Sequence, residues 1–391
     1  MYNIIVVRYG EIAVKGRNRY MFEDKLVTNI KNSLKDVGNV KVYKGDGRLY
    51  IDVDDFNYMD IVEEAKKVFG VFSLSPAIKG KRDFEILKEN AKRVLEDKID
   101  MDDIKTFKVE SKRPDKSFKL KSPEMSREIG GFLLSNFSDD VSVNVRKPDA
   151  TIFAEMRKDC SIVYADKIDG FGGLPLGTNG KALLLLSGGI DSPVAGFLIG
   201  KRGVEIEAIH FHSYPFTNEK SQEKVRDLAR ILAKYCGKIT MHKANILPVQ
   251  KQINKNCEES HMTIISRRFM MRIANQLAKK IGANALITGE SIGQVASQTM
   301  QGLNATNAVI DMPAFRPLIG TDKSEIIDIA KAIKTYETSI IPEEDCCTVF
   351  LPKKPVTKPR LEKIERLEES LDIDSLVNEV LENIETIEVT Y

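Results

Sequence analysis

The segment Ser187–Ser192, SGGIDS, contains residues suited to binding phosphate. Its two adjacent glycines permit a tight turn and let a ligand approach the backbone closely. Pro193 suits the first turn of a helix, with Asp191 or Ser192 as the cap. Backbone N–H groups at a helix N-terminus attract anions, so the segment predicts a phosphate-binding turn. A strand-to-helix turn without a ligand is the alternative.

Cys346 and Cys347 are a second group of residues that could take part in a reaction. They lie between the sequences PEED and PKKP, which are typical of a loop, and an accessible, thiolate-prone cysteine can carry sulfur as a persulfide. The other three cysteines lie in apolar or helical patterns and are interpreted as small buried side chains: Cys160, Cys236 and Cys257. No CxxC pair indicates zinc, and we predict no resident metal-ligand set.

The phosphate-binding turn must be positioned by the elements around it. Leu183–Leu186 are four consecutive leucines, typical of a central parallel strand that is buried on both faces. From there strands and helices alternate, which predicts an α/β fold with a doubly wound parallel sheet. The predicted strands are Ala182–Leu186, Val204–Phe211, Ile239–Lys243 and Ala285–Ile287, and the predicted helices are Ser192–Lys201, Glu219–Tyr235, Met262–Ile281 and Ser324–Ile333. Ligands of such sheets bind beyond the carboxyl ends of the strands.

Two further segments precede this sheet. Residues 1–78 follow the order βαββαβ of a ferredoxin-like α+β domain, with a hairpin around Gly45–Gly47. Residues 79–169 mix helices at Phe84–Leu95 and Pro123–Phe137 with strands. The glycine-rich residues 170–180 are interpreted as a linker to a last domain, residues 181–391.

Charge is unevenly distributed along the chain. Lys105–Arg127 contains eight Lys or Arg against three Asp or Glu, whereas Leu361–Tyr391 contains two against ten. A basic front half suits nucleic acid, and the interleaved Phe107 and Phe118 either stack on unpaired bases or belong to the core. The candidate RNA-binding residues are Lys105, Lys108, Lys112, Arg113, Lys116, Lys119, Lys121 and Arg127.

Several classes of protein are excluded by composition. A chain of 391 residues is long enough for two or three domains. No apolar run approaches the roughly 20 residues needed to span a membrane, and the N-terminus lacks the pattern of a secretion signal. Five cysteines in such a chain do not form a disulfide framework. We therefore expect a cytoplasmic protein without a membrane partner.

The turn is neither a Walker A loop nor a dinucleotide fingerprint, because GxxxxGK[ST] is absent and no GxGxxG follows a strand. It resembles the pyrophosphatase loop (PP-loop) of enzymes that split ATP between its α and β phosphates. The whole chain resembles the tRNA 4-thiouridine synthase, or tRNA sulfurtransferase, family (ThiI type). Matching stretches include RYGE with KGRN, SREIGGFLL, GLPLGTNGK, SGGIDSPVAG, AIHFHSYPFT, TGESIGQVASQT and PEEDCCTVFLPKKP.

The resemblance implies a ferredoxin-like domain, an RNA-binding THUMP domain over residues 79–169, with a family-style start near residue 60, and a PP-loop catalytic domain. It places ATP contacts at Leu185, Leu186, Ser187, Gly188, Gly189, Ser192, His210, Phe211, Arg267, Gly289 and Gln298. Arg267 is otherwise interpreted as part of a solvated pair. Asp191 either caps the helix or also holds Mg²⁺ beside the triphosphate, and Lys323 either reaches a phosphate or is merely exposed.

The resemblance also implies a reaction. ATP adenylates the C4 oxygen of a uridine, at tRNA position 8, and a persulfide then replaces the oxygen with sulfur. The family's sulfur-carrying cysteine aligns best with Cys347, and Cys346 is a candidate resolving thiol. Some members carry a C-terminal rhodanese domain, for which the 44 residues after Cys347 are too few. We therefore expect a cysteine desulfurase to supply sulfur directly or through a separate protein.

Two other functions fit parts of the sequence. A PP-loop enzyme that modifies another tRNA base would have the same turn, and an RNA-binding protein that uses ATP only as a ligand would have the same basic stretch. Some relatives also supply sulfur for thiamine biosynthesis. Exposed helix faces are compatible with a homodimer.

Overall fold

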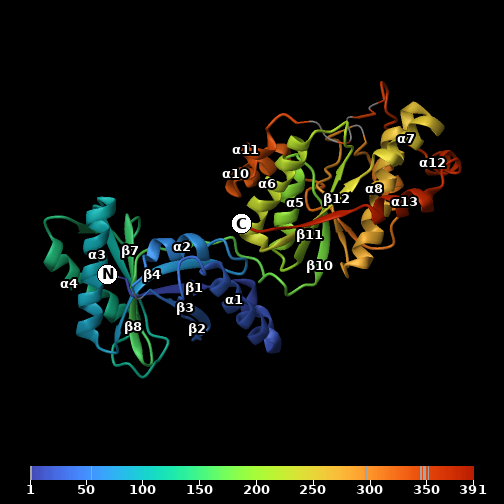
Figure 1. Ribbon diagram of the computed structural model, residues 1–391. Coiled ribbons are helices and arrows are strands. Elements are labelled where there is room, and N and C mark those ends of the chain that lie inside the picture. Colours follow the sequence, from blue (N-terminus) through green and yellow to red (C-terminus); the bar gives the residue numbers. More distant parts are fainter. Residues whose placement is uncertain (1, 54, 296, 344–345, 347–348, 351) are drawn as a thin grey trace. The chain divides into compact units, whose positions relative to one another are not determined.

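The computed structural model describes residues 2–53, 55–295, 297–343, 346, 349–350 and 352–391 (Figure 1). The chain divides into two compact units, Met1–Pro175 and Leu176–Tyr391. Each unit has its own sheet and its own apolar core.

The first unit contains one mixed sheet and four α-helices among its described residues. Its strands are β1 (Ile4–Arg8), β2 (Val42–Gly45), β3 (Arg48–Asp52), β4 (Ser73–Lys81), β5 (Thr106–Lys112), β6 (Ser142–Val143), β7 (Ala150–Met156), β8 (Cys160–Tyr164) and β9 (Ile168–Asp169). Its helices are α1 (Arg19–Ser33), α2 (Tyr58–Ala65), α3 (Phe84–Asp102) and α4 (Ser122–Phe137), with short 3-10 turns at Glu11–Val14 and Gly16–Asn18. Up to β4 the order is βαββαβ, as the sequence predicts.

Strand β4 joins the two halves of this sheet. The strand order is β2-β3-β1-β4-β8-β7-β5-β6, and β9 pairs with β4. The first part of β4 pairs with β1, and its last part, from Ile78, pairs with β8. Leu26 of α1 and Ile61 of α2 pack in one core, while Leu87 of α3 and Ile129 of α4 pack in the next. The ferredoxin-like and the following α/β segment therefore share one sheet.

The second unit is built around a six-stranded sheet in its described part. The strands are β10 (Lys181–Leu185), β11 (Glu205–His212), β12 (Ile239–Asn245), β13 (Leu286–Ile287), β14 (Ala314–Phe315) and β15 (Glu385–Val389). The helices are α5 (Asp191–Gly200), α6 (Glu219–Cys236), α7 (Leu247–Asn256), α8 (Met262–Lys280), α9 (Met300–Asn307), α10 (Lys323–Ala332), α11 (Tyr336–Ser339), α12 (Leu361–Glu368) and α13 (Ile373–Glu382), with a 3-10 turn at Glu259–His261.

The leucine strand β10 lies inside this sheet, in the order β14-β13-β10-β11-β12-β15. Leu183 and Leu184 are fully buried, as expected of a strand covered on both faces. Helix α5 packs against α6 and α10, and α8 packs against α7, α9 and α13 (Figure 1). The helices thus cover both faces, which is the doubly wound arrangement predicted from the sequence.

One edge of the sheet differs from the prediction. Strand β15 pairs with β12 in the antiparallel direction, so the sheet is not entirely parallel. The sequence pattern predicts an acidic helix over residues 375–384 and no strand after it. Thr386, Ile387 and Val389 are β-branched residues, which favour a strand, but their alternation over five residues is too short to stand out beside that helix.

Candidate active site

A cavity of about 440 Å³ lies beyond the carboxyl ends of β10, β11 and β13. This is the place where ligands bind in open α/β sheets, and the volume is in the range of small-molecule sites. One part of its wall is polar and another is apolar. Its lining residues are Leu185, Leu186, Ser187, Gly189, Asp191, Ser192, Ile209, His210, Phe211, Thr263, Arg267, Met270, Met271, Thr288, Gly289, Glu290, Val295, Ser297, Gln298, Cys346 and Pro355.

The turn between β10 and α5 is folded by its two serines. The Ser187 backbone N–H donates to Ser192 Oγ at 2.9 Å, and the Gly189 N–H donates to Ser187 Oγ at 3.3 Å. Neither Gly188 nor Gly189 has a positive φ, so the turn does not need glycine for its backbone conformation. Their missing side chains instead leave the backbone at the start of α5 open to an anion.

Gly289 is required by the close approach of two backbones. A Cβ atom at this position would lie 2.7 Å from the Ser192 backbone nitrogen and 2.8 Å from the Asp191 carbonyl carbon. Real Cβ atoms do not come so close to backbone atoms. The chain after β13 can therefore pass the start of α5 only because residue 289 lacks a side chain.

Asp191 is not the helix cap that the sequence allowed. The cap position is Ile190, and no side chain caps this end of α5. The two carboxylate oxygens of Asp191 instead accept from Lys323 Nζ at 2.6 Å and from Gln294 Nε2 at 2.8 Å. The sequence allowed two interpretations of Lys323, a phosphate contact or a merely exposed residue. Its ion pair with Asp191 places it at the edge of the turn.

No group of three His, Cys, Asp or Glu side chains that could hold a metal is found among the described residues. Asp191 is a single carboxylate at the helix start. Mg²⁺ in nucleotide sites is commonly held by one or two carboxylates together with the phosphates. Asp191 is therefore compatible with a magnesium ion that arrives with a triphosphate and exchanges with its present partners, Lys323 and Gln294.

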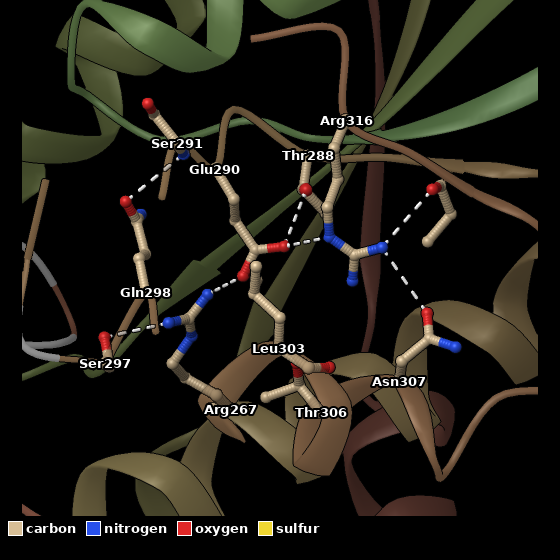
Figure 2. Close-up of polar contacts among 12 residues, drawn as sticks. Arg267, Thr288, Glu290, Ser291, Ser297, Gln298, Leu303, Thr306, Asn307 and Arg316 are labelled. Carbon is tan, nitrogen blue, oxygen red and sulfur yellow. Dashed lines mark hydrogen bonds and ion pairs between the residues drawn. The ribbon is translucent and has the colours of Figure 1, made fainter. Parts of the chain in front are cut away.

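Arg267 reaches the cavity from α8 and is held from two sides (Figure 2). Its Nη1 donates to Ser297 Oγ at 2.8 Å, and its Nη2 pairs with Glu290. It is thus not the solvated residue of the alternative interpretation. Burial alone raises the pKa of the Glu290 carboxyl, but Arg267 and Arg316 outweigh burial and hold that pKa below its usual value.

The remaining predicted ATP contacts lie around the same cavity. His210 is buried, and its Nδ1 lies 3.1 Å from the Leu186 carbonyl oxygen, so β11 is tied to the end of β10. Gln298 Oε1 accepts from the Ser291 N–H at 3.3 Å. Leu185, Leu186 and Phe211 supply apolar wall. Gly188 belongs to the turn but not to the lining.

Cys346 lines this cavity, but its side chain is only 5% exposed and packs with the core. Its backbone carbonyl accepts from Gln250 Nε2 at 2.9 Å. The expectation of an accessible loop thiol is therefore wrong for Cys346. Cys347, the predicted sulfur carrier, lies outside the described residues.

The basic stretch of the first unit is only partly available to a partner. Lys105 pairs with Asp103 at 2.6 Å, and Lys108 pairs with Glu110 at 2.7 Å. Arg113 donates to the carbonyls of residues 116 and 118. The exposed members of the stretch are Lys105, Lys112, Lys116, Lys119, Lys121 and Arg127. Phe107 is fully buried and cannot stack on a base, and Phe118 packs near Phe84.

The sequence places Glu290 at a strand end that faces the predicted crevice, but it assigns no role to Glu290, Thr288, Ser297 or Arg316. Thr288, Glu290 and Ser297 line the cavity, and Arg316 stands behind Glu290 (Figure 2). Each comes from a loop whose neighbours in space are distant in sequence.

Within the described chain, no helix is both long and apolar enough to cross a membrane.

Three family models match the chain. The ThiI ferredoxin-like domain matches residues 4–75, the THUMP domain matches residues 81–166, and the thiamine biosynthesis protein (ThiI) matches residues 177–373. The probable tRNA sulfurtransferase of Alkaliphilus metalliredigens (strain QYMF) is 58% identical over 385 residues, which are 98% of each chain. That of Alkaliphilus oremlandii (strain OhILAs) is 56% identical over 386 residues, again 98% of each.

A solved structure gives the same result. The crystal structure of a 4-thiouridine synthetase–RNA complex with bound ATP matches with a TM-score of 0.93 at 39% identity and covers 100% of both chains. Its likeness extends over the ferredoxin-like, THUMP and PP-loop portions together. On the strength of 58% identity along 98% of its length, this chain belongs to the tRNA sulfurtransferase (ThiI) family of enzymes.

Proposed function

We propose that this protein uses ATP to convert a uridine of tRNA, at position 8, into 4-thiouridine. The observation that carries the proposal is the composition of one cavity. The phosphate-binding turn at Ser187 and Ser192, the cationic Arg267 and the residue next to the predicted sulfur carrier, Cys346, all line it. A cavity that held ATP only as a structural ligand would not need a cysteine in its wall.

ATP is the substrate that this wall suits best. The open backbone around Gly189 and the start of α5 would receive the phosphates, because helix N-termini stabilise anions. Arg267 adds a full positive charge, and Leu186 and Phe211 form apolar wall suited to a base. The related 4-thiouridine synthetase was crystallised with ATP bound. Mg²⁺ that accompanies the phosphates would neutralise charge beside Asp191.

The first chemical step is an adenylation. The uridine C4 oxygen attacks the α-phosphorus of ATP, the bond between the α-phosphorus and the bridging oxygen breaks, and pyrophosphate leaves. The turn and Arg267 stabilise the negative charge that develops on the phosphates. A poor leaving oxygen thereby becomes part of a good leaving group, AMP. The residues act mainly by positioning the base in line with the phosphorus.

The second step replaces oxygen with sulfur. The terminal sulfur of a Cys347 persulfide bonds to uridine C4, and AMP departs with the former uridine oxygen. A second thiol then cleaves the sulfur–sulfur bond, which releases 4-thiouridine and leaves a disulfide on Cys347. Cys346 or an external thiol is the second thiol, and an external dithiol reduces the disulfide. A cysteine desulfurase would load the persulfide.

The first unit would hold the tRNA. We assign residues 1–78 to the ferredoxin-like domain, 79–169 to the THUMP domain and 181–391 to the catalytic domain, with 170–180 between them. Lys112, Lys116, Lys119, Lys121 and Arg127 are exposed and suit a phosphate backbone. The reaction brings together tRNA, ATP and reduced thiols, as the cytoplasm does.

Removal of two exposed lysines tests this docking surface. We expect the Lys116→Ala/Lys119→Ala variant to bind tRNA more weakly and with a smaller dependence on salt. With the coefficients known for DNA, each lost phosphate contact reduces the slope of log K against log salt by about 0.7 for a single strand to about 0.9 for a duplex. Fluorescence anisotropy at several salt concentrations measures it. Lys251→Ala/Lys255→Ala removes two exposed lysines of α7 and should leave the slope unchanged. Equal slopes for wild type and the first variant would contradict the assignment.

Nucleoside mass analysis separates the proposed reaction from its rivals. Unmodified tRNA is incubated with the protein, ATP and a persulfide donor, and then digested. We expect 4-thiouridine, and its formation should stop when ATP is omitted. A sulfur-containing nucleoside other than 4-thiouridine would favour an enzyme that modifies another base. No modified nucleoside and no tRNA-dependent pyrophosphate would favour an RNA-binding protein that only binds ATP.

A further inference from the structure

A buried carboxylate lies between two guanidinium groups at the edge of the cavity (Figure 2). The side chain of Glu290 is 7% exposed. Its Oε1 pairs with Arg267, while its Oε2 accepts from Arg316 Nε at 2.7 Å and from Thr288 Oγ1 at 2.9 Å. Both oxygens are therefore occupied, and the carboxylate is fixed in position.

The two arginines differ in what else they contact. Arg267 lines the cavity, whereas Arg316 does not. Arg316 Nη1 donates weakly to Asn307 Oδ1 at 3.4 Å and to the Ala314 carbonyl at 3.3 Å, which keeps it behind Glu290. Two arginines and one carboxylate carry a net positive charge. Because Arg316 offsets the charge of Glu290, the charge of Arg267 remains available to an anion in the cavity.

A second cluster of the same construction stands on the same helix. The next residue of α8, Arg268, pairs with Glu368 at 2.8 Å, and Arg272 pairs with the same carboxylate at 2.7 Å. Glu368 is 3% exposed, and none of these three residues lines the cavity. The described part of the second unit thus contains two buried carboxylates that are each held by two arginines, Glu290 and Glu368, and of these only Glu290 adjoins the cavity.

We propose that Glu290 is a positioning residue for the nucleotide, which acts by holding Arg267 against the phosphates of ATP, with Arg316 as its counter-charge. The inference rests on the proposed function, because it takes the cavity to be the ATP site. Ser297 fixes Arg267 Nη1, so Glu290 and Ser297 together define the plane of the guanidinium (Figure 2). A mobile arginine side chain would lose conformational entropy when ATP binds, and this loss would reduce the affinity for ATP.

The direction in which one substitution changes the ATP affinity distinguishes a positioning role from a purely electrostatic effect. Glu290→Gln removes a negative charge next to an anion site. If Glu290 affected ATP only through its charge, the variant would bind ATP more tightly. If Glu290 holds Arg267 in place, the variant binds ATP more weakly despite the gain in positive charge. Positioning therefore predicts the opposite direction from electrostatics.

The experiment is calorimetric titration of the full-length protein with ATP in the absence of tRNA. We expect Glu290→Gln to weaken ATP binding about tenfold and the matched control Glu368→Gln to leave it unchanged, although both lower the melting temperature. In an Arg267→Ala background, Glu290→Gln should have little further effect, because it acts through that arginine. Arg316→Gln should also weaken binding, although Arg316 does not line the cavity.

Three results would overturn the inference: unchanged or tighter ATP binding by Glu290→Gln, an equal loss in Glu368→Gln, or additive losses with Arg267→Ala. If Glu290→Gln does not fold, Arg316→Gln provides the test instead, and unchanged ATP affinity in that variant rejects the inference. Failure of the proposed function is distinguishable. In that case the wild-type protein itself would not bind ATP, or would bind it without making 4-thiouridine.

Discussion

The Cys347→Ser variant is expected to form no 4-thiouridine but still to release pyrophosphate when tRNA and ATP are present. A serine hydroxyl cannot carry a persulfide, whereas the adenylation step uses only the turn, Arg267 and the uridine oxygen. The amount of 4-thiouridine should fall below the limit of detection. Nucleoside mass analysis measures the product, and a coupled pyrophosphate assay measures the first step in the same reaction.

Cys236 provides the matched control for this variant. It is fully buried, and burial raises the pKa of its thiol to about 12, so it does not become a thiolate near neutral pH. Cys236→Ala should retain both activities. A Cys346→Ala variant separates the two candidates for the second thiol, because it blocks product release only if Cys346 resolves the persulfide. Full 4-thiouridine formation by Cys347→Ser would show that another group carries the sulfur.

Replacing Gly289 with alanine is expected to weaken ATP binding by at least tenfold. The new Cβ would lie 2.7 Å from the Ser192 backbone nitrogen, so either the turn or the chain after β13 must move. Overpacking of this kind costs about 1–3 kcal/mol of folding free energy, and here the displaced atoms form the predicted phosphate site. ATP titration and thermal unfolding measure the two effects.

Gly320→Ala is the control for the Gly289 substitution. A Cβ at Gly320 meets no atom within 4 Å, and its φ is not positive. We therefore expect nearly normal ATP binding and stability from Gly320→Ala. If Gly289→Ala bound ATP as tightly as this control, the contact between the chain after β13 and the start of α5 would not shape the site.

Much of the fold could be predicted because its signals are local. The buried leucines of β10, the amphipathic α6 and the glycine-rich approach to β10 each lie within a short window of sequence. Strand β15 could not be predicted in this way. Its pairing with β12 joins residues up to 150 positions apart, such as Ile239 and Val389, and depends on a partner that no local pattern reveals.

The candidate site shows the same division. Ser187, Gly189 and Ser192 stand together in the sequence and meet in the turn, and their chemistry could be inferred from spacing. Gly289 is indicated both by its place at a strand end and by the family resemblance, whereas Arg267 comes from the resemblance alone, and both residues line the same cavity. Glu290 follows a predicted strand, but its role could not be predicted because it depends on arginines from α8 and from the segment after β14.

Burial is another property that spacing did not predict. The prolines and charges around Cys346 indicate a loop, yet its side chain packs with the core of the second unit. Asp191 likewise stands where a helix cap is expected, but its carboxylate forms an ion pair with Lys323, which is 132 positions away. In both cases a contact from a distant segment outweighs the local preference.

The fate of the uridine oxygen tests the central claim most directly. A tRNA is prepared with heavy oxygen at C4 of the target uridine and is incubated with the protein, ATP and a persulfide donor. Adenylation of that oxygen predicts that the label appears in the phosphate group of AMP, in proportion to the 4-thiouridine formed. Label recovered in water, pyrophosphate or inorganic phosphate, with unlabelled AMP, would contradict the proposed mechanism.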